Sequence, residues 1–144
     1  GSELALACTK TIPAISAVVL NTMRGSTSEF IWHSPYGQAF RPLYEVQGYS
    51  EATLYNELRP VEACEHLDRL GKRHVLLYYS KADKTIPPNN TELFVKALAA
   101  SGVKHRIIRN RYLGHFWAAV KNHMVFWVWL KFLRQAEHRL RTHS

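Results

Sequence analysis

Three short segments of the chain have the hydrophobic pattern of β-strands. Residues 15–20 and 75–79 are apolar almost throughout, as expected of strands that are covered on both faces. Residues 106–110 form a third segment, built around two isoleucines. Helical patterns separate the three, and strands that alternate with helices are typical of parallel sheets with right-handed crossovers. The sequence therefore predicts an α/β protein with a small parallel sheet of about three strands flanked by helices.

The helical patterns differ in how clearly their ends are marked. Ser50 can cap the start of one helix, and Pro60 fits the first turn of the next. The last helix has an apolar centre at 125–130 with no polar side, which predicts burial on more than one face. The predicted helices are 3–8, 50–55, 59–67, 90–100 and about 118–140.

A long connector at about 26–50 follows the first strand and has no regular pattern. It begins as a polar loop, and residues 30–49 then combine prolines and glycines with large aromatic side chains. Such a connector is unusual in a compact domain and tends to form a lid, a pocket wall or an interface. We expect the whole chain, residues 1–144, to form a single domain around it.

Composition excludes several classes of protein. Apolar residues make up 47% of the chain and charged residues 21%, which excludes a disordered polypeptide. The longest apolar run has seven residues, short of the ~20 that span a bilayer, and no secretory signal is recognised, so we expect a cytoplasmic location. Cys8 and Cys64 lack the spacing of metal ligands, and we expect both to be reduced and buried. We predict no metal and no cofactor.

Positive charge is concentrated at one end of the chain. Residues 1–103 contain ten Lys or Arg and ten Asp or Glu, whereas residues 104–144 contain nine Lys or Arg and only Glu137 as an acid. Such a region can meet nucleic acid, an anionic surface or an acidic ligand. A solvated helix face followed by a tail explains the same charge, and we favour that interpretation because no nucleic-acid motif accompanies it.

Asp83 and His115 are the candidate catalytic residues. Asp83 follows the second predicted strand and His115 follows the third, so the two will lie close together if these strands are parallel neighbours. A carboxylate that orients an imidazole is the arrangement of a general base. Each residue also has a simpler interpretation, because an Asp after a strand commonly caps the next turn and a Gly-His pair is commonly a surface turn.

Taken together, these segments resemble the C-terminal part of an α/β-hydrolase of the prolyl-oligopeptidase and dienelactone-hydrolase kind. By this resemblance Asp83 is the acid of a Ser-His-Asp triad and His115 is its base. Residues 3–7 and 14–20 are similar to the helix and strand that follow the family's nucleophile elbow. The other matching segments are the strand 75–79, Asp83 ahead of Ile86-Pro87, the helix that ends near 102–103, the strand 106–110, and Gly114-His115.

The sequence departs from this family at the nucleophile. The motif Gly-x-Ser-x-Gly, which carries the serine on a sharp strand-to-helix turn, does not occur in these 144 residues. Ser2 has no preceding strand, and Ser80 follows the wrong strand for the family. The resemblance therefore implies a truncated hydrolase-like fold that carries an incomplete or vestigial triad and is inactive alone.

Three functions are compatible with these features. We expect first a self-associating binding or interaction module, a homodimer in which the second copy covers the bare edge of the sheet. The second is a fragment of an active serine hydrolase for a small ester or peptide, completed by a missing N-terminal half. The third is binding of an anionic ligand or nucleic acid through residues 104–144.

Overall fold

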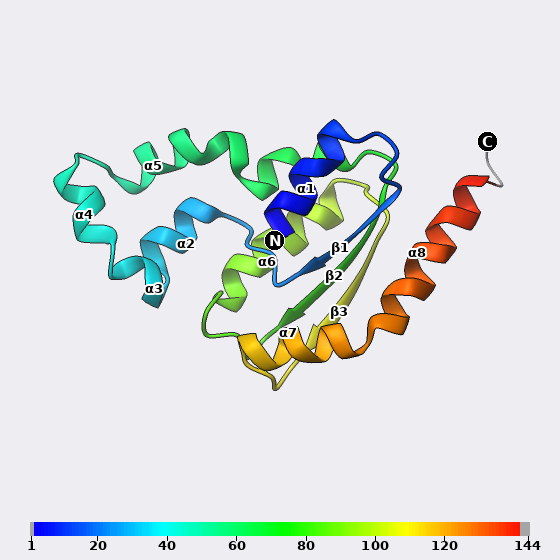
Figure 1. The fold of residues 1–144 in the computed structure, drawn as a ribbon. Coiled ribbons are helices and arrows are strands. Elements are labelled where there is room, and N and C mark those ends of the chain that lie inside the picture. The colour runs from blue at the N-terminus through cyan, green and yellow to red at the C-terminus, as the bar shows by residue number, and fades with distance from the viewer. Residues whose placement is uncertain (1, 142–144) are drawn as a thin grey trace.

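The computed structural model describes residues 2–141, and a parallel sheet of three strands lies at its centre (Figure 1). The strands are β1 at Ala17–Asn21, β2 at His74–Ser80 and β3 at His105–Asn110, and their order in the sheet is β1-β2-β3. All seven residues of β2 are buried, because this strand is paired on both sides and covered on both faces. The predicted α/β architecture is confirmed, and the predicted strands differ from the observed ones only at their ends.

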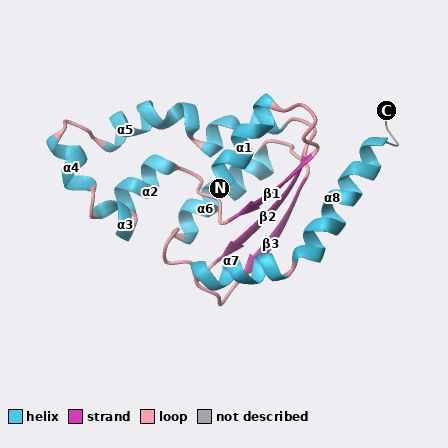
Figure 2. Ribbon diagram, in the orientation of Figure 1, coloured by secondary structure: helices cyan, strands magenta, loops and turns pink. Residues whose placement is uncertain are grey.

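Helices cover both faces of the sheet (Figure 2). The helices α1 (Ser2–Thr11) and α6 (Pro88–Ala100) pack on one face, where alternate strand residues form the hydrophobic core with them. The helices α7 (His115–Met124) and α8 (Phe126–Arg141) follow β3, and α8 packs on the other face. The core includes Leu20, Val75, Leu77, Tyr79, Phe94 and Leu98, each with at most 2% of its surface exposed.

The connector that was predicted to be irregular is mostly helical. Short helices extend away from the sheet on the left of Figure 1. Serines cap the first two of these helices: the Ser26 and Ser34 side chains each accept a backbone N–H bond at the helix start. The predicted cap at Ser50 is confirmed, as part of a capping box with Thr53. The helices of the connector are α2 (Thr27–His33), α3 (Pro35–Gln38) and α4 (Arg41–Val46). After the connector come α5 (Glu51–Leu58) and the 3₁₀ helices η1 (Arg59–Val61) and η2 (Ala63–Leu70), where helices were predicted at 50–55 and 59–67.

The prediction of one long, well-buried final helix is wrong. Val125 leaves the helical region with ψ of 31°, so the segment is divided into α7 and α8. Trp127 remains 75% exposed, because a helix on the outside of a three-stranded sheet can bury only one side. In the apolar centre 125–130, Phe126 and Trp127 are therefore exposed and the other four residues are only partly buried.

Two further expectations concern membranes and cysteines. Within residues 2–141, no helix combines the length and the apolar character that crossing a membrane requires. Cys8 and Cys64 are free thiols, as predicted, but each is only partly buried. The expectation of full burial is wrong because both lie on helices at the margin of the core.

Candidate functional site

Asp83 and His115 lie at the same edge of the sheet, where the parallel strands end. β2 ends at Ser80, three residues before Asp83, and His115 is the first residue of α7, shortly after the end of β3. Because β2 and β3 are parallel neighbours, the loops that follow them meet. The structure thus brings together the two residues that the sequence singled out.

The two side chains form a short hydrogen bond. His115 Nδ1 lies 2.7 Å from Asp83 Oδ2, and the carboxylate only accepts, so the ring nitrogen donates. The Asp83 side chain is 3% exposed and that of His115 is 35% exposed. The bond holds the neutral imidazole in the tautomer whose Nε2 carries the lone pair, as a general base requires.

The second oxygen of Asp83 is also occupied. Asp83 Oδ1 accepts hydrogen bonds from the backbone N–H groups of Thr85 at 2.8 Å and Ile86 at 2.9 Å. This is the turn cap that the simpler interpretation predicted, and it coexists with the bond to His115. The two backbone donors fix the carboxylate and compensate for its burial.

Ser80 joins the two loops that carry Asp83 and His115. Its buried hydroxyl donates to the backbone carbonyl of Leu113, and it accepts from the backbone N–H of Ala82 at 3.2 Å. Sequence reasoning considered Ser80 only as a nucleophile and missed this role; its place at the end of a buried strand was the available signal. The hydroxyl is buried and engaged, which is incompatible with attack on a substrate. The side chain of Ser2 lies outside the described residues.

An asparagine pair anchors the helix that carries His115. Asn122 lies two turns further along α7 and is 7% exposed, and its Nδ2 donates to Asn21 Oδ1 at 2.8 Å. Asn21 is the last residue of β1. The bond fixes α7 across the end of the sheet, and sequence patterns give no signal for a contact between residues so far apart.

The other ring nitrogen of His115 is uncommitted. Among the described residues, no hydrogen-bond partner is found for Nε2. In the same part of the chain, no group of three His, Cys, Asp or Glu side chains is arranged to hold a metal ion. The site can therefore orient a base and accept a proton through Nε2.

Solved structures with the same fold are α/β hydrolases. A puromycin hydrolase matches with a TM-score of 0.61 and 20% identity, over 80% of this chain and 17% of that protein. The acylaminoacyl peptidase of Pyrococcus horikoshii matches with a TM-score of 0.64 and 18% identity, over 79% of this chain and 18% of that protein. Acetyl xylan esterase 1 from a Thermoanaerobacterium species matches with a TM-score of 0.57 and 19% identity, over 80% of this chain and 37% of that protein. The fold is thus that of an α/β hydrolase, and the chain spans less than a fifth of the length of the puromycin hydrolase and of the acylaminoacyl peptidase.

Sequence comparison identifies the family within this class. The model of the prolyl oligopeptidase family matches residues 10–136, which is most of the chain. The chain belongs to the prolyl oligopeptidase family. The comparison with curated proteins gave no match.

Proposed function

We propose that Asp83 and His115 are the acid and base of a Ser-His-Asp site that hydrolyses an ester or peptide bond. The serine and the oxyanion donors would come from outside these 144 residues, so the chain alone is inactive. The observation that carries this proposal is the 2.7 Å bond to His115 Nδ1, which leaves Nε2 available for a proton.

In the proposed reaction, His115 Nε2 takes the proton from a serine hydroxyl as its oxygen attacks the carbonyl carbon of the substrate. Asp83 stabilises the imidazolium that forms, without taking the proton itself. The proton then passes from Nε2 to the leaving alcohol or amine as the bond to the carbonyl carbon breaks. A water molecule then attacks the acyl carbonyl while His115 Nε2 takes its proton. The proton passes to the serine oxygen as the acyl group is released.

The arrangement of α1 supports the proposed origin of the serine. This helix packs against β1 and runs in the opposite direction, so it begins on the side toward which the strands point (Figure 1). A segment that leads into α1 would therefore approach the edge of the sheet that holds Asp83 and His115. A nucleophile on such a segment needs no rearrangement of the described fold.

The test combines this chain with a separate polypeptide that carries the Gly-x-Ser-x-Gly half of a family hydrolase. The chain alone is expected to show no turnover of p-nitrophenyl acetate, and the assembled pair is expected to hydrolyse it. In the pair, His115→Gln should lower kcat by about a thousandfold or more. His33→Gln, an exposed histidine distant in the chain, is the matched control and should retain activity.

Two results would contradict this proposal. Turnover by the chain alone that His115→Gln abolishes would show that a nucleophile is already present. Equal activity of the His115→Gln and wild-type pairs, with the two polypeptides co-eluting in size exclusion, would show that His115 is not the base of the reaction.

We also propose self-association through the apolar face of α7 and α8, which we define as Phe116, Trp117, Met124, Phe126 and Trp127. Each of these side chains is about half exposed or more. Large side chains have roughly 150–250 Å² of surface each, and about two thirds of it is exposed on average in these five. The face therefore offers roughly 650 Å², close to the ~800 Å² that each partner buries in a standard interface. A hollow of about 490 Å³ beside Phe116 and Met124 could receive a side chain from a second copy.

Sedimentation velocity at micromolar concentration tests the proposed homodimer. The wild-type chain is expected to sediment as a dimer and Trp127→Glu as a monomer, because the substitution buries an unpaired charge in the interface. Leu43→Glu, which alters an exposed leucine on α4, is the control and should remain dimeric. A monomeric wild-type protein would rule out the interface.

A further inference from the structure

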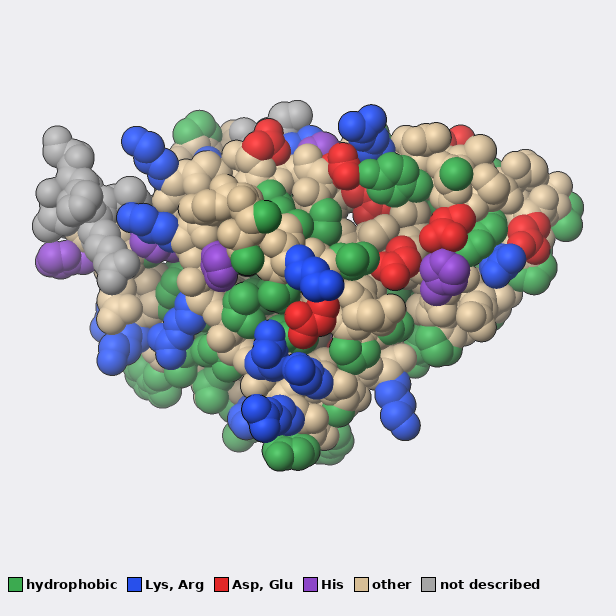
Figure 3. Space-filling model, turned by 180° about the vertical axis from the view of Figure 1, so that it is seen from behind, with side chains coloured by type: hydrophobic (Ala, Val, Ile, Leu, Met, Phe, Trp, Pro, Cys, Tyr) green, Lys and Arg blue, Asp and Glu red, His purple; other side chains and the backbone are tan. Residues whose placement is uncertain are grey.

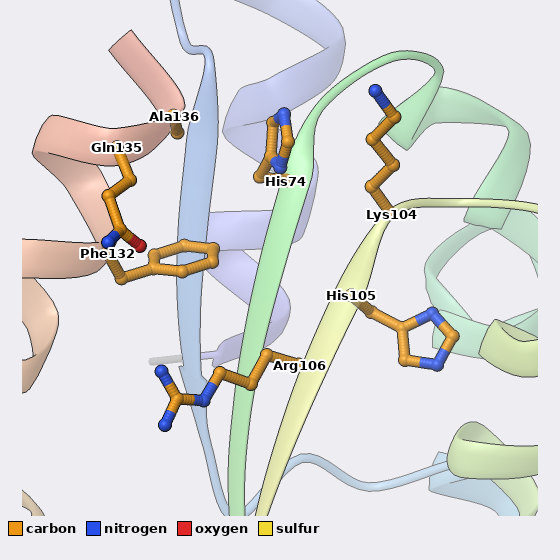
Figure 4. Close-up of a pocket in the computed structure, with 7 residues that line it drawn as sticks. All are labelled: His74, Lys104, His105, Arg106, Phe132, Gln135 and Ala136. Carbon is orange, nitrogen blue, oxygen red and sulfur yellow. The ribbon is translucent and has the colours of Figure 1, made fainter. Parts of the chain in front are cut away.

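A hollow of about 370 Å³ lies at the edge of the sheet opposite the Asp83–His115 pair (Figure 4). His74, Lys104 and Arg106 approach it from the beginnings of β2 and β3, and Phe132 and Gln135 approach it from α8. No Asp or Glu lines it. The volume is within the range of small-molecule sites, and the polar side chains that line it are those of Lys104, Arg106 and Gln135 and the imidazoles of His74 and His105.

Arg106 is the central charged group of this hollow. It pairs in register with the fully buried Leu76, and Figure 4 shows its side chain extending from β3 toward the part of α8 that carries Phe132. Within residues 2–141, neither Arg106 nor Lys104 has a carboxylate partner. Both side chains are exposed, and Figure 4 shows that of Lys104 extending away from that of Arg106, so Arg106 is the cation that reaches toward α8.

The part of the chain that contributes Lys104 and Arg106 is strongly basic, with nine Lys or Arg and one acidic residue in 104–144. Seen from behind, Lys and Arg side chains gather over the left and lower parts of the molecule, and Asp and Glu lie mainly over the upper and right-hand parts (Figure 3). Glu137, the single acidic residue of 104–144, does not line the hollow. The excess of basic residues in 104–144 attracts an anionic ligand toward this region before it makes any contact.

An aromatic wall distinguishes the hollow from a simple basic patch. The rings of His74 and Phe132 meet edge to face, with their centroids 6.5 Å apart. Phe132 presents its ring to the same hollow that Arg106 and Gln135 line (Figure 4). A ligand with both a ring and an anionic group can therefore use both kinds of contact.

We propose that this hollow binds a small phosphate ester that carries a planar ring. The phosphate would lie on Arg106, whose fork of N–H groups matches phosphate oxygens, with Lys104 at the rim as a second cation. The ring would pack against Phe132, with Gln135 donating to the ester or the ring. A hollow with a single central guanidinium suits one terminal phosphate better than the continuous backbone of a nucleic acid, which follows an extended basic stripe.

Phenyl phosphate is the probe for this site, titrated against the full chain and followed by NMR or calorimetry. Saturable binding is expected, and Arg106→Gln should weaken it by about tenfold or more. Arg134→Gln removes the same charge from α8 outside the lining and should leave the affinity almost unchanged. Phe132→Leu should weaken the binding of phenyl phosphate but not that of inorganic phosphate. Circular dichroism of each variant verifies the fold, and Arg106→Lys, which keeps the charge without the fork, should bind with intermediate affinity.

Three results would overturn the assignment. The first is no saturable binding of phenyl phosphate by the wild-type chain. The second is an equal loss in Arg106→Gln and Arg134→Gln, which would indicate a diffuse basic surface. The third is displacement of phenyl phosphate by a single-stranded oligonucleotide with steep salt dependence, which would assign the surface to nucleic acid.

Discussion

At the scale of single residues, Asp83 shows how one buried carboxylate can serve the fold and the candidate site together. Its Oδ1 accepts from two backbone N–H groups, and its Oδ2 accepts from His115. The side chain is almost fully buried. Its removal therefore affects stability as well as any chemistry at His115.

Asp83→Ala is expected to destabilise the chain by about 2–4 kcal/mol, because the N–H groups of Thr85 and Ile86 lose a charged acceptor. Asp83→Asn should cost only about 1 kcal/mol, since an amide oxygen can still accept from both. Urea denaturation of the two variants measures the difference. Equal losses of stability would contradict the role assigned to Oδ1.

Cys64 illustrates a residue whose environment reduces its reactivity. Burial raises the pKa of its thiol to about 11, and the nearby carboxylates of Glu62 and Glu65 act in the same direction. Because only the thiolate reacts, the thiol should be slow to alkylate at neutral pH.

In a Cys8→Ser background, alkylation of Cys64 by iodoacetamide should accelerate about tenfold per pH unit up to pH 10, without a plateau. The sign follows from the raised pKa, which keeps the thiol protonated over this range. Mass spectrometry of quenched samples gives the rates. A plateau just above the ordinary pKa of 9.0 would contradict the effect of burial.

At the scale of elements, a single asparagine joins α6 to the loop between β1 and α2. Asn90 Oδ1 accepts from the backbone N–H of Gly25 at 3.0 Å, and its Nδ2 donates to the Ser26 carbonyl and to Glu29 Oε2. Gly25 has no room for a side chain, since a Cβ there would lie 2.3 Å from the Asn90 carbonyl oxygen. The contact sets how the helical connector leaves the sheet.

Asn90→Ala is expected to lower the free energy of unfolding by about 2–3 kcal/mol, because one buried and two partly buried hydrogen bonds lose a partner. The exposed neighbour Asn89 supplies the control, and Asn89→Ala should change stability by less than about 0.5 kcal/mol. Thermal melts of both variants test the comparison. Similar losses at the two positions would indicate a general effect on the start of α6.

Elements were predictable where the sequence repeats a simple pattern. The runs 15–20 and 75–79 identify strands because they are apolar almost throughout, and Ser50 identifies a helix start because its hydroxyl can cap it. The helices α2, α3 and α4 were missed because they have only seven, four and six residues. Such short segments do not show the 3.6-residue period of apolar positions that identifies a helix. The break at Val125 was missed because a β-branched apolar residue gives no stop signal.

At the scale of the whole molecule, the candidate pair was predictable because topology brings it together. Parallel neighbours end at one edge, so Asp83 and His115 could be expected to meet from their order alone. The hollow beneath α8 could not, because it depends on how α8 crosses the sheet after the break at Val125. The bonds of Ser80 to Leu113 and of Asn21 to Asn122 were also hidden, since they join residues distant in sequence.

Hydrogen exchange should follow the uneven distribution of burial. The amides of β2 are expected to exchange most slowly, since this strand is buried throughout and paired on both sides. The amides of α4, a helix without a buried residue, should exchange fastest among the helices of the connector. Mass spectrometry of peptic fragments gives the order. Equal protection of α4 and β2 would contradict a single core centred on the sheet.

The bond between Ser80 and Leu113 has a consequence for how a split active centre could operate. The bond joins the loop that carries Asp83 to the loop that carries His115. The conformational entropy that is lost on orienting these two side chains is therefore lost when the chain folds, before any partner binds. An incoming serine would meet a preorganised imidazole and would have only its own oxygen to position. The binding free energy between this chain and the polypeptide that carries the serine would then serve assembly alone. None of it would be needed to orient His115.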